Sequence, residues 1–418
     1  MNRGLINAQA IAGTHAPQTG RAWPVYSDMP ASHLYIHVPF CGRRCSYCDF
    51  SIAVRAKTPV DEYLTALRAE LGGQRGSIGL AALDTVYLGG GTPSRLGGLG
   101  LRDVLNAVRE NATIAADAEV TIEANPDDVN DMAVAHWVAA GVNRVSLGAQ
   151  SFNDEALRWM HRTHGASQIV EAVRTLQRGG IQNISLDLIF ALPTHLNRSW
   201  EADLDQAIAL EPAHLSLYGL TVETKTPIAR WADRGAVVQG SEENYEEEFL
   251  TAHSMMASAG FEHYEVSNFA RPALGSRHNS AYWTGEAYAG VGPSAHSFDG
   301  AVRSWNVAAY SDWLRCLALG ESVIAGEETL TDENRIAEEV YLGLRTQRGL
   351  AITHNDLPRV RVWESQGWAA VENHGDASRV RLSPTGWLRL DSLAADLAAG
   401  RSNPVNTTIG ATPSHCYI

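Results

Sequence analysis

The fold is decided by Leu34–Phe50, LYIHVPFCGRRCSYCDF, in which a short apolar run leads directly into three closely spaced cysteines. The run at 34–38 is aliphatic and aromatic, which is the composition of a buried strand. Pro39 ends this strand because proline cannot donate a hydrogen bond to a neighbouring strand. The cysteines therefore lie on a loop that leaves the C-terminal end of a strand. They are Cys41, Cys45 and Cys48.

The spacing C-x3-C-x2-C favours a [4Fe–4S] cluster, because three thiolates leave one iron open to a further ligand. A structural zinc site is a weaker interpretation, since zinc normally takes four ligands in two separated pairs. Cys316 and Cys416 are distant and have no pairing pattern, and His37 would be a fourth ligand only by chance. Unrelated thiols are the remaining alternative, while disulfides belong to secreted chains, of which this sequence shows no sign.

The cysteine spacing, together with Tyr47, resembles the signature of the radical S-adenosylmethionine (SAM) superfamily. The longer motif YIHVPFC…C…YCDF resembles that of the oxygen-independent coproporphyrinogen III oxidase group, and specifically that of its haem-chaperone branch, HemW. The resemblance runs from about Leu34 to about Leu393. It implies a [4Fe–4S] cluster held by the three cysteines, with SAM bound at the open iron.

The chain has 418 residues, enough for one large domain and a smaller one. Its formal net charge is −14, which argues against non-specific nucleic-acid binding, because such binding requires a basic surface. No apolar run reaches the length of a membrane span, and the N-terminus lacks the layout of a signal peptide. Five cysteines, three of them clustered, fit a reducing compartment, so we expect a cytoplasmic protein. Nothing in the sequence indicates whether the chain dimerises.

Six short apolar segments, most of them separated by amphipathic helical stretches, predict an α/β fold of parallel βαβ units. Six units are too few for a closed eight-fold barrel, and an open partial barrel or a doubly wound sheet fits the pattern equally well. The resemblance implies the radical SAM partial (β/α)6 barrel. The expected strands are 34–38, 84–88, 119–123, 144–148, 184–190 and 214–220. The clearest expected helices are 60–71, 101–111 and 166–179.

Composition and hydrophobic periodicity divide the chain into four parts. Residues 1–31 and 397–418 lack periodicity and are expected to be disordered tails. Residues 32–300 are expected to hold the barrel with its C-terminal extension. Within 301–396, an amphipathic helix followed by short strands and a closing helix predicts a small C-terminal winged-helix-like α+β domain.

Polar and glycine-rich residues fall at the C-terminal ends of the predicted strands, where barrels of this kind carry their chemistry. GGGTP at 89–93 offers backbone amides without side chains, although a triple glycine alone is more often a tight turn. A carboxylate can hold ribose hydroxyls and an arginine can hold a carboxylate, but each is also common as an ordinary core or surface polar group. The resemblance aligns the following residues with SAM-contacting positions: Tyr35, Tyr47, Gly90, Gly91, Thr92, Glu123, Gln150, Arg162 and Asp187.

The sequence departs from the oxidases at Phe50, where those enzymes carry a further cysteine and the haem-chaperone branch carries phenylalanine. This departure puts the oxidation of coproporphyrinogen in doubt. The resemblance therefore implies a chaperone that binds haem and transfers it to acceptor apoproteins. The alternative is an oxygen-independent coproporphyrinogen III oxidase of porphyrin biosynthesis that works by radical SAM chemistry. No residue is assigned a catalytic role.

His278 opens the segment HNSAYW, which reads as H-N-x-x-Y-W, a motif of the haem-chaperone branch. An imidazole can be an axial haem ligand, and aromatic rings can pack against the macrocycle. We expect this segment on a loop outside the barrel, where haem can enter and leave, with Arg271 and Arg277 as a local basic rim. The alternative is a hydrogen-bonded histidine in aromatic surroundings. His263 and His296 are weaker candidates.

Overall fold

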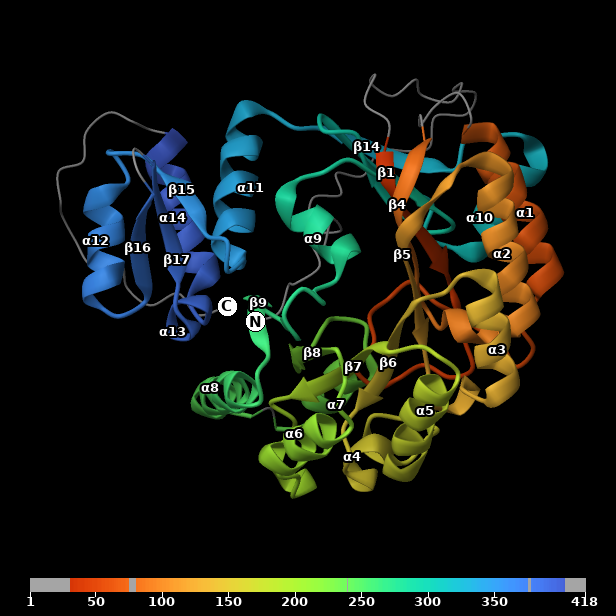
Figure 1. Ribbon diagram of the computed structural model, residues 1–418, viewed down its shortest axis with the longest axis horizontal. Helices are drawn as coiled ribbons and strands as arrows, with labels where there is room; N and C mark the ends of the chain where they lie inside the picture. Colours follow the sequence, from red (N-terminus) through yellow and green to blue (C-terminus); the bar gives the residue numbers. More distant parts are fainter. Residues whose placement is uncertain (1–30, 75–79, 239, 375–376, 403–418) are drawn as a thin grey trace. The chain divides into compact units, whose positions relative to one another are not determined.

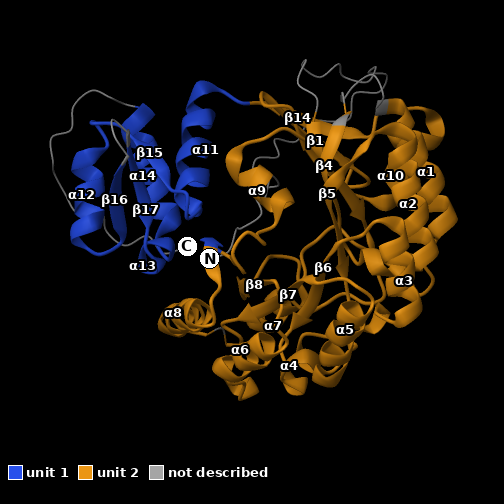
Figure 2. Cartoon of the chain, in the orientation of Figure 1, with its two compact units in different colours: residues 1–7, 264–266, 330–418 blue, residues 8–263, 267–329 orange. Residues whose placement is uncertain are grey.

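The structure, a computed structural model, describes residues 31–74, 80–238, 240–374 and 377–402 of the 418-residue chain. These residues form two compact units, shown in Figure 2. Among the described residues, the larger unit holds 31–263 and 267–329, and the smaller unit holds 264–266 and 330–402.

The unit boundaries differ from the predicted ones. Residues 301–329 belong to the larger unit, whereas the sequence predicted a small domain beginning at 301. Residues 397–402 were expected in a tail, but they complete the helix α14 (Leu390–Ser402). Ala31, the last residue of the other predicted tail, begins the first strand. The remaining residues of both predicted tails lie outside the described residues.

One sheet runs through the larger unit, and twelve of its strands lie in the described residues. At its centre are the six predicted strands, each hydrogen-bonded in parallel to the next. They are β1 (Ala31–Val38), β4 (Leu80–Gly90), β5 (Ile114–Ala124), β6 (Arg144–Gln150), β7 (Asn183–Phe190) and β8 (His214–Gly219).

The order of these strands in the sheet follows their order in the chain, β1-β4-β5-β6-β7-β8. A doubly wound sheet reverses its strand order part-way across. The structure therefore has the winding of a barrel, which confirms the predicted partial (β/α)6 barrel.

Further strands extend the sheet at both ends. Beside β1 lies β11 in parallel, followed by the antiparallel strands β12, β13 and β14. Beside β8 lies the antiparallel strand β10, followed by β9. Their bounds are β9 (Glu262–Glu265), β10 (Asn268–Ala270), β11 (Tyr288–Val291), β12 (His296–Phe298), β13 (Val302–Asn306) and β14 (Ile324–Thr329).

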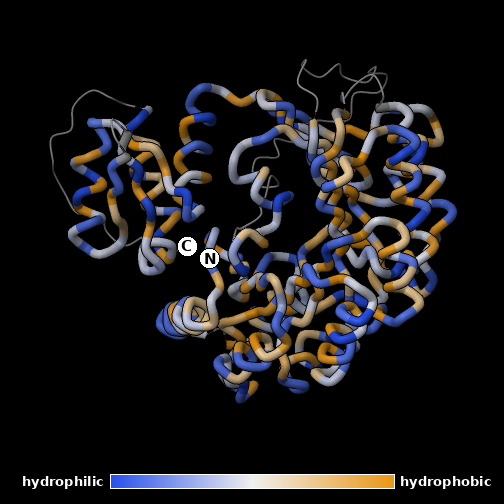
Figure 3. Tube along the Cα trace, viewed as in Figure 1, coloured by the Kyte–Doolittle hydropathy of each residue, from blue (hydrophilic) through white to orange (hydrophobic). Residues whose placement is uncertain are grey.

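Helices connect the strands and cover the outside of the sheet. In Figure 1, α1, α2, α3 and α10 lie on one side of β1, β4 and β5, and α9 lies on the other. Along the outer helices, hydrophobic and hydrophilic residues alternate, as expected of helices with one buried face (Figure 3). The helices are α1 (Val60–Gln74), α2 (Gly97–Asn111), α3 (Asp131–Ala140), α4 (Asp154–Trp159), α5 (Ala166–Arg178), α6 (Trp200–Ala209), α7 (Pro227–Asp233), α8 (Glu242–Ser258), α9 (Arg277–Thr284) and α10 (Tyr310–Leu319).

Side chains alternate between the two faces of the central strands, because successive residues of a strand point in opposite directions. On β1, Leu34, Ile36 and Val38 form the buried apolar set. Tyr35 and His37 lie on the opposite face, and their side chains contact each other. The inner face of the barrel is therefore polar, while its outer face supplies the hydrophobic core beneath the helices.

The buried carboxylate of Glu70 anchors the strand extension to α1. It accepts hydrogen bonds from the amide of Gly292 at 2.9 Å, the indole of Trp313 at 2.8 Å and the amide group of Asn306 at 2.7 Å. Burial raises the pKa of Glu70 to about 7, and the three hydrogen bonds act in the opposite direction. These bonds join α1, α10 and the β11–β13 segment into one body.

The smaller unit begins with a helix and ends with closing helices, as the sequence predicted, and a strand and a second helix precede its hairpin. Its sheet is antiparallel with the order β15-β17-β16. A buried ion pair joins Arg345 to Glu265 at 3.0 Å. Its elements are α11 (Asp332–Arg345), β15 (Leu350–Ile352), α12 (Leu357–Ser365), β16 (Ala369–His374), β17 (Ala377–Leu382), α13 (Pro384–Trp387) and α14. Among the helices of the described residues, none has both the length and the apolar character needed to span a membrane.

Candidate functional site

The cysteine loop begins at β2 (Phe40–Cys41), directly after β1, and ends at β3 (Ala53–Val54). β2 and β3 pair in parallel, which closes the loop at its base. Its middle is fixed by Ser46, whose amide donates to the carbonyl of Met160 at 3.1 Å and whose carbonyl accepts from the amide of Ile228 at 2.9 Å. All three cysteine side chains on this loop are half-buried.

Two of the three thiols lie beside hydrogen-bonding groups that come from other strand ends. The hydroxyl of Thr92 is 3.5 Å from Sγ of Cys41. The guanidinium of Arg162 donates to Sγ of Cys45 at 3.4 Å. Burial raises the pKa of Cys41 and raises that of Cys48 to about 12, so metal binding must release protons from these thiols.

The donor set of the loop suits an iron–sulfur cluster. In the part of the chain that the structure describes, no three His, Cys, Asp or Glu side chains converge as a site for one metal ion. A [4Fe–4S] cluster places each thiolate on a different iron, so its ligands stand apart and need not converge on one point. Three thiolates, two of them beside a hydroxyl or a guanidinium, therefore fit such a cluster with one iron left for another ligand.

The glycine turn after β4 is packed against the start of the cysteine loop. Gly90 has a φ of +106°, and a Cβ there would lie 2.4 Å from the ring of His37. A Cβ at Gly91 would lie 2.6 Å from the backbone of Pro39. Both positions therefore require glycine for steric reasons. The close packing also places the amides of the turn beside the cysteines.

Two half-buried carboxylates lie on the inner face of the barrel. Glu123 accepts hydrogen bonds from the hydroxyl of Tyr87 at 2.9 Å and the amide of Gly90 at 3.0 Å. Asp187 accepts from the hydroxyl of Ser146 at 2.9 Å. Burial raises the pKa of Glu123 to about 7 and that of Asp187 to about 6, and the charge of Asp187 adds to the shift of Glu123. Near neutral pH, these carboxyl groups can therefore accept hydrogen bonds from the hydroxyls of a ligand when ionised, or donate hydrogen bonds to them when protonated.

Arg162 and Gln150 lie together over Gly148, beside the cysteine loop. Nη2 of Arg162 donates to Oδ1 of Asn125 at 2.5 Å and to the carbonyl of Gly148 at 2.9 Å, while Nη1 reaches Cys45. A Cβ at Gly148 would lie 2.9 Å from Nε2 of Gln150 and 3.1 Å from Nη2 of Arg162. Gln150 is buried and has a φ of +69°, a left-handed conformation that is uncommon for a residue with a side chain.

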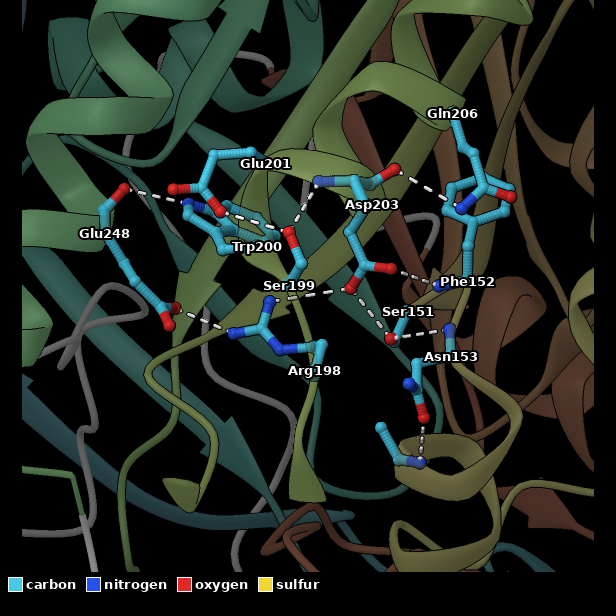
Figure 4. Close-up of polar contacts among 12 residues, drawn as sticks. Ser151, Phe152, Asn153, Arg198, Ser199, Trp200, Glu201, Asp203, Gln206 and Glu248 are labelled. Carbon is cyan, nitrogen blue, oxygen red and sulfur yellow. Dashed lines mark hydrogen bonds and ion pairs between the residues drawn. The ribbon is translucent and has the colours of Figure 1, made fainter. Parts of the chain in front are cut away.

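A buried ionic network holds the loops that follow β6 and β7 (Figure 4). Arg198 lies between Asp203, at 3.5 Å, and Glu248, at 2.7 Å. Asp203 also accepts from the hydroxyl of Ser151 at 2.7 Å and from the next backbone amide at 2.8 Å. These bonds fix the two residues directly after Gln150. The network therefore supports the chain directly after the left-handed residue Gln150.

The two predicted tyrosines lie on different segments, Tyr35 on the strand β1 and Tyr47 on the cysteine loop. Tyr35 is on the inner face of β1, where its hydroxyl is 3.1 Å from Nδ1 of His37 and its ring stacks on that of Tyr87 at 6.1 Å. Burial lowers the pKa of His37 to about 4, so this imidazole is neutral at physiological pH. Tyr47 is on the cysteine loop between Cys45 and Cys48, and burial raises the pKa of this phenol.

The expectation that HNSAYW forms a loop is wrong, because Arg277–Thr284 is the helix α9. His278 is only 1% exposed. Its Nδ1 is 2.7 Å from the hydroxyl of Thr85 and its Nε2 is 2.8 Å from the hydroxyl of Tyr282. Burial lowers its pKa to about 3. In this conformation, neither ring nitrogen of His278 is open to a haem iron.

The other histidines and the two arginines considered for haem binding are buried, half-buried or in contact with other groups of the protein. His263 is buried and stacks on Phe269, with ring centroids 3.8 Å apart. His296 lies half-buried, and burial lowers its pKa to about 4. Arg271 covers the ring of Phe261, and Arg277 donates to a backbone carbonyl of β5 at 2.7 Å. The two arginines therefore do not form a rim around an open haem pocket.

Comparison with known proteins identifies the family. Residues 35–207 match the family model described as the Radical SAM superfamily. Over 380 residues the chain is 35% identical to the heme chaperone HemW of Mycobacterium tuberculosis, covering 90% of this chain and 97% of that protein. Over 318 residues it is 34% identical to the heme chaperone HemW of Lactococcus lactis, covering 76% of this chain and 82% of that protein. The chain belongs to the HemW family.

A solved structure shows the same fold as this HemW-family chain. It is the coproporphyrinogen III oxidase HemN of Escherichia coli, described as a radical SAM enzyme. The TM-score is 0.74, the sequence identity is 21%, and the match covers 88% of this chain and 90% of that one. At this identity, the likeness is one of fold alone, and it agrees with the partial barrel built from the six parallel strands.

Several residues of the HemW-family site were missed by sequence reasoning. Tyr87 and Ser146 donate hydrogen bonds to the two half-buried carboxylates, and His37 packs against Gly90. The alternation of side chains along each strand could have predicted these three residues. Each lies an even number of residues from a predicted site residue or glycine of its own strand, and therefore on the same face. The network around Arg198 carries no such signal, because its members come from two loops and two helices.

Proposed function

We propose that this HemW-family chain binds haem and transfers it to acceptor apoproteins, and that it carries a [4Fe–4S] cluster and SAM as resident cofactors. One observation carries the cofactor part: a loop with three half-buried cysteines directly follows a parallel strand, and the donors of Thr92 and Arg162 reach two of the thiols. The haem part rests on the heme chaperone relatives, which match the chain over most of its length.

The proposed roles follow from what each residue can donate or accept. The three cysteines would hold the cluster, and SAM would bind beside it at the iron that they leave open. Gly90, Gly91 and Thr92 line the methionine part, and Arg162 binds its carboxylate. When bound, the cluster can supply one electron to SAM. The remaining residues would hold the nucleoside through hydrogen bonds to its hydroxyls and base: Tyr35, Tyr47, Glu123, Gln150 and Asp187.

The cluster is tested by anaerobic reconstitution with iron and sulfide. We expect about four irons per chain in the parent. Cys41→Ala should abolish the cluster absorption band, whereas Cys316→Ala, a buried cysteine outside the loop, should leave it unchanged. Equal loss in both variants would refute the three-ligand assignment.

SAM binding is tested by calorimetry on the reconstituted chain. We expect weaker binding in Glu123→Ala and in Asp187→Ala, because each variant removes a carboxylate from the inner face. Asp205→Ala, on the exposed face of α6, is the control. Unchanged affinity in both site variants would remove these carboxylates from the SAM site.

Haem binding is tested by titration followed through the Soret band, and transfer by mixing the loaded chain with a haem-free apoprotein. The sequence motif assigns the axial ligand to His278. Iron could reach Nε2 of this residue only after the hydroxyl of Tyr282 has left it. Absence of stoichiometric haem binding by the parent chain would refute the chaperone function.

A further inference from the structure

A buried arginine, Arg144, begins β6 and lies on the inner face of the barrel. The residue is 2% exposed. It shares this face with Ser146, two residues further along the strand, whose hydroxyl binds Asp187. Burial raises the pKa of Asp187 to about 6 and also raises the pKa of Tyr87, and the charge of Arg144 opposes both shifts. The guanidinium is therefore close to inner-face groups of β4 and β7.

The guanidinium of Arg144 has no hydrogen-bond acceptor among the residues that the structure describes. Its ion pair is long, with 4.0 Å between Nε and the carboxylate of Glu119. That carboxylate is used elsewhere, because it accepts hydrogen bonds from the amides of Arg277 and His278, each at 3.0 Å, at the N-terminus of α9. A buried cation without hydrogen bonds costs free energy, so proteins normally supply it with an anionic or polar partner.

Other buried arginines of this chain are partnered in that way. Arg198 is 2.7 Å from the carboxylate of Glu248, and Arg345 is 3.0 Å from that of Glu265. Arg345 is 2% exposed, as Arg144 is. Arg144 thus differs from them in its partners and not in its burial.

Two further polar groups without partners lie beside Arg144 on the neighbouring strands. Its register partners in the sheet are Thr121 on β5 and Asn183 on β7. The hydroxyl of Thr121 and Oδ1 of Asn183 are buried, and neither has a hydrogen-bond partner in the described part of the chain. Thr121 shares the strand face of Glu123, and Asn183 shares that of Asp187. We call Arg144, Thr121 and Asn183 the inner-face triad.

Solvent reaches the inner face at the position of the triad. Tyr35 and Tyr87 continue the same row of register partners across β1 and β4, next to Thr121. Both tyrosines are half-buried, as are Glu123 and Asp187, which lie further along their strands. These strands are in the middle of the sheet, so the exposed parts of the four residues are their inward-facing side chains. A small ligand can therefore approach the triad along the inner face.

We propose that the inner-face triad binds the carboxylate of a small organic acid. The planar guanidinium of Arg144 donates two N–H groups to the two carboxylate oxygens, and the hydroxyl of Thr121 is a further donor. Oδ1 of Asn183 can accept from a hydroxyl next to the carboxylate, so a small 2-hydroxy acid uses all three groups. This site is distinct from the proposed SAM contacts of Arg162 and Glu123, and the inference does not depend on the proposed haem-chaperone function.

The experiment is equilibrium dialysis of radiolabelled lactate, a small 2-hydroxy acid, against the full-length reconstituted chain at fixed ionic strength. The test variant is Arg144→Met, which keeps an unbranched side chain and removes the charge. We expect at least a tenfold weaker affinity, because the charge-assisted hydrogen bonds are lost. The matched control is Arg174→Met, on the exposed face of α5, which should bind lactate as the parent does. Iron content and melting temperature establish that each variant is folded.

A second variant, Thr121→Val, leaves the charge in place and removes only a hydroxyl without a partner. It should keep the melting temperature of the parent and bind lactate about two- to tenfold more weakly. Parent-like lactate binding by Arg144→Met, or no binding by the parent chain, would overturn the acid site. Displacement of lactate by equimolar haem would assign Arg144 to a haem propionate and would overturn it as well. Cluster assembly and haem transfer are measured separately, so their failure would leave this result unaffected.

Discussion

At the scale of single residues, Arg162 makes the contact with the most direct chemical consequence. Its guanidinium donates to Sγ of Cys45, and two further acceptors hold it in place. A cation that donates to a cluster ligand stabilises the more negative, reduced cluster. With the proposed cluster bound to Cys45, this contact would raise the reduction potential of the cluster.

We predict that Arg162→Gln lowers the midpoint potential of the reconstituted cluster. A charge-assisted hydrogen bond is worth about 1.5–3 kcal/mol, which corresponds to about 60–130 mV for a one-electron couple. The measurement is a potentiometric titration followed by electron paramagnetic resonance without SAM. Arg174→Gln, on the exposed face of α5, is the control and should keep the parent potential. An unchanged potential in Arg162→Gln would show that the contact does not tune the cluster.

The second residue-scale prediction concerns Glu123 and pH. Burial raises its pKa to about 7, above the value near 4.5 of a solvated glutamate. The folded chain therefore binds this proton more readily than the unfolded chain does. The stabilisation is complete below pH 4.5 and is lost as the pH rises through about 7.

We expect the free energy of unfolding of the parent to fall between pH 5 and 8 by more than that of Glu123→Gln. Denaturant titrations of the metal-free chains at several pH values measure this difference. The exposed Glu247→Gln variant should follow the parent curve. Parallel curves for the parent and Glu123→Gln would contradict the raised pKa.

At the scale of elements, the network around Arg198 joins α6 and α8 to the loops after β6 and β7 (Figure 4). We predict that Asp203→Ala lowers the free energy of unfolding by about 2–3 kcal/mol, because it removes the acceptor of the Ser151 hydroxyl and the Phe152 amide and leaves Arg198 with Glu248 alone. It should also weaken SAM binding, since the backbone of Gln150 loses its support. Unfolding titrations and calorimetry measure the two effects.

Asp205→Ala is the matched control for Asp203→Ala, because it lies two residues away on the same helix and is exposed. It should change the free energy of unfolding by less than about 0.5 kcal/mol. If Asp203→Ala lost stability but kept the SAM affinity of the parent, the network would stabilise the fold without contributing to SAM binding.

The docking of α9 against β4 gives another element-scale prediction. His278→Ala removes the partner of Thr85 and of Tyr282 and leaves a cavity inside the barrel. We expect the free energy of unfolding to fall by about 2–4 kcal/mol. Asn279→Ala, at the neighbouring half-buried position, should cost less than half as much. Equal stability of His278→Ala and the parent would show that α9 does not depend on this histidine.

At the scale of the whole molecule, the barrel fold is shared with HemN, so the fold does not decide between oxidase and chaperone. The difference lies in individual residues such as Phe50, which is 48% exposed and has no thiol. We predict that the reconstituted chain, given SAM and a reductant, does not convert coproporphyrinogen III. The measurement is porphyrin fluorescence after oxidation of the product, with an active oxidase assayed in parallel. Formation of protoporphyrinogen would replace the chaperone proposal by the oxidase alternative.

The sequence by itself determined the six strands, the cysteine loop and the polar strand ends. Each of these depends on residues close together in the chain: the period of two in a strand, the position of Pro39 and the spacing of three cysteines. Predicted and observed strands agree except at their ends: the first five extend by one to several residues because neighbouring strands provide hydrogen-bond partners, and β8 ends one residue earlier than predicted.

Only the tertiary structure decided the winding of the sheet, the partners of the site residues and the place of α9. Arg162 reaches Cys45 across 117 residues, and His278 reaches Thr85 across 193. No local pattern encodes such contacts, because they exist only after the strands have paired in one order and the helices have packed. The same packing buries the histidine that the motif singled out and brings Thr121, Arg144 and Asn183 side by side on three strands.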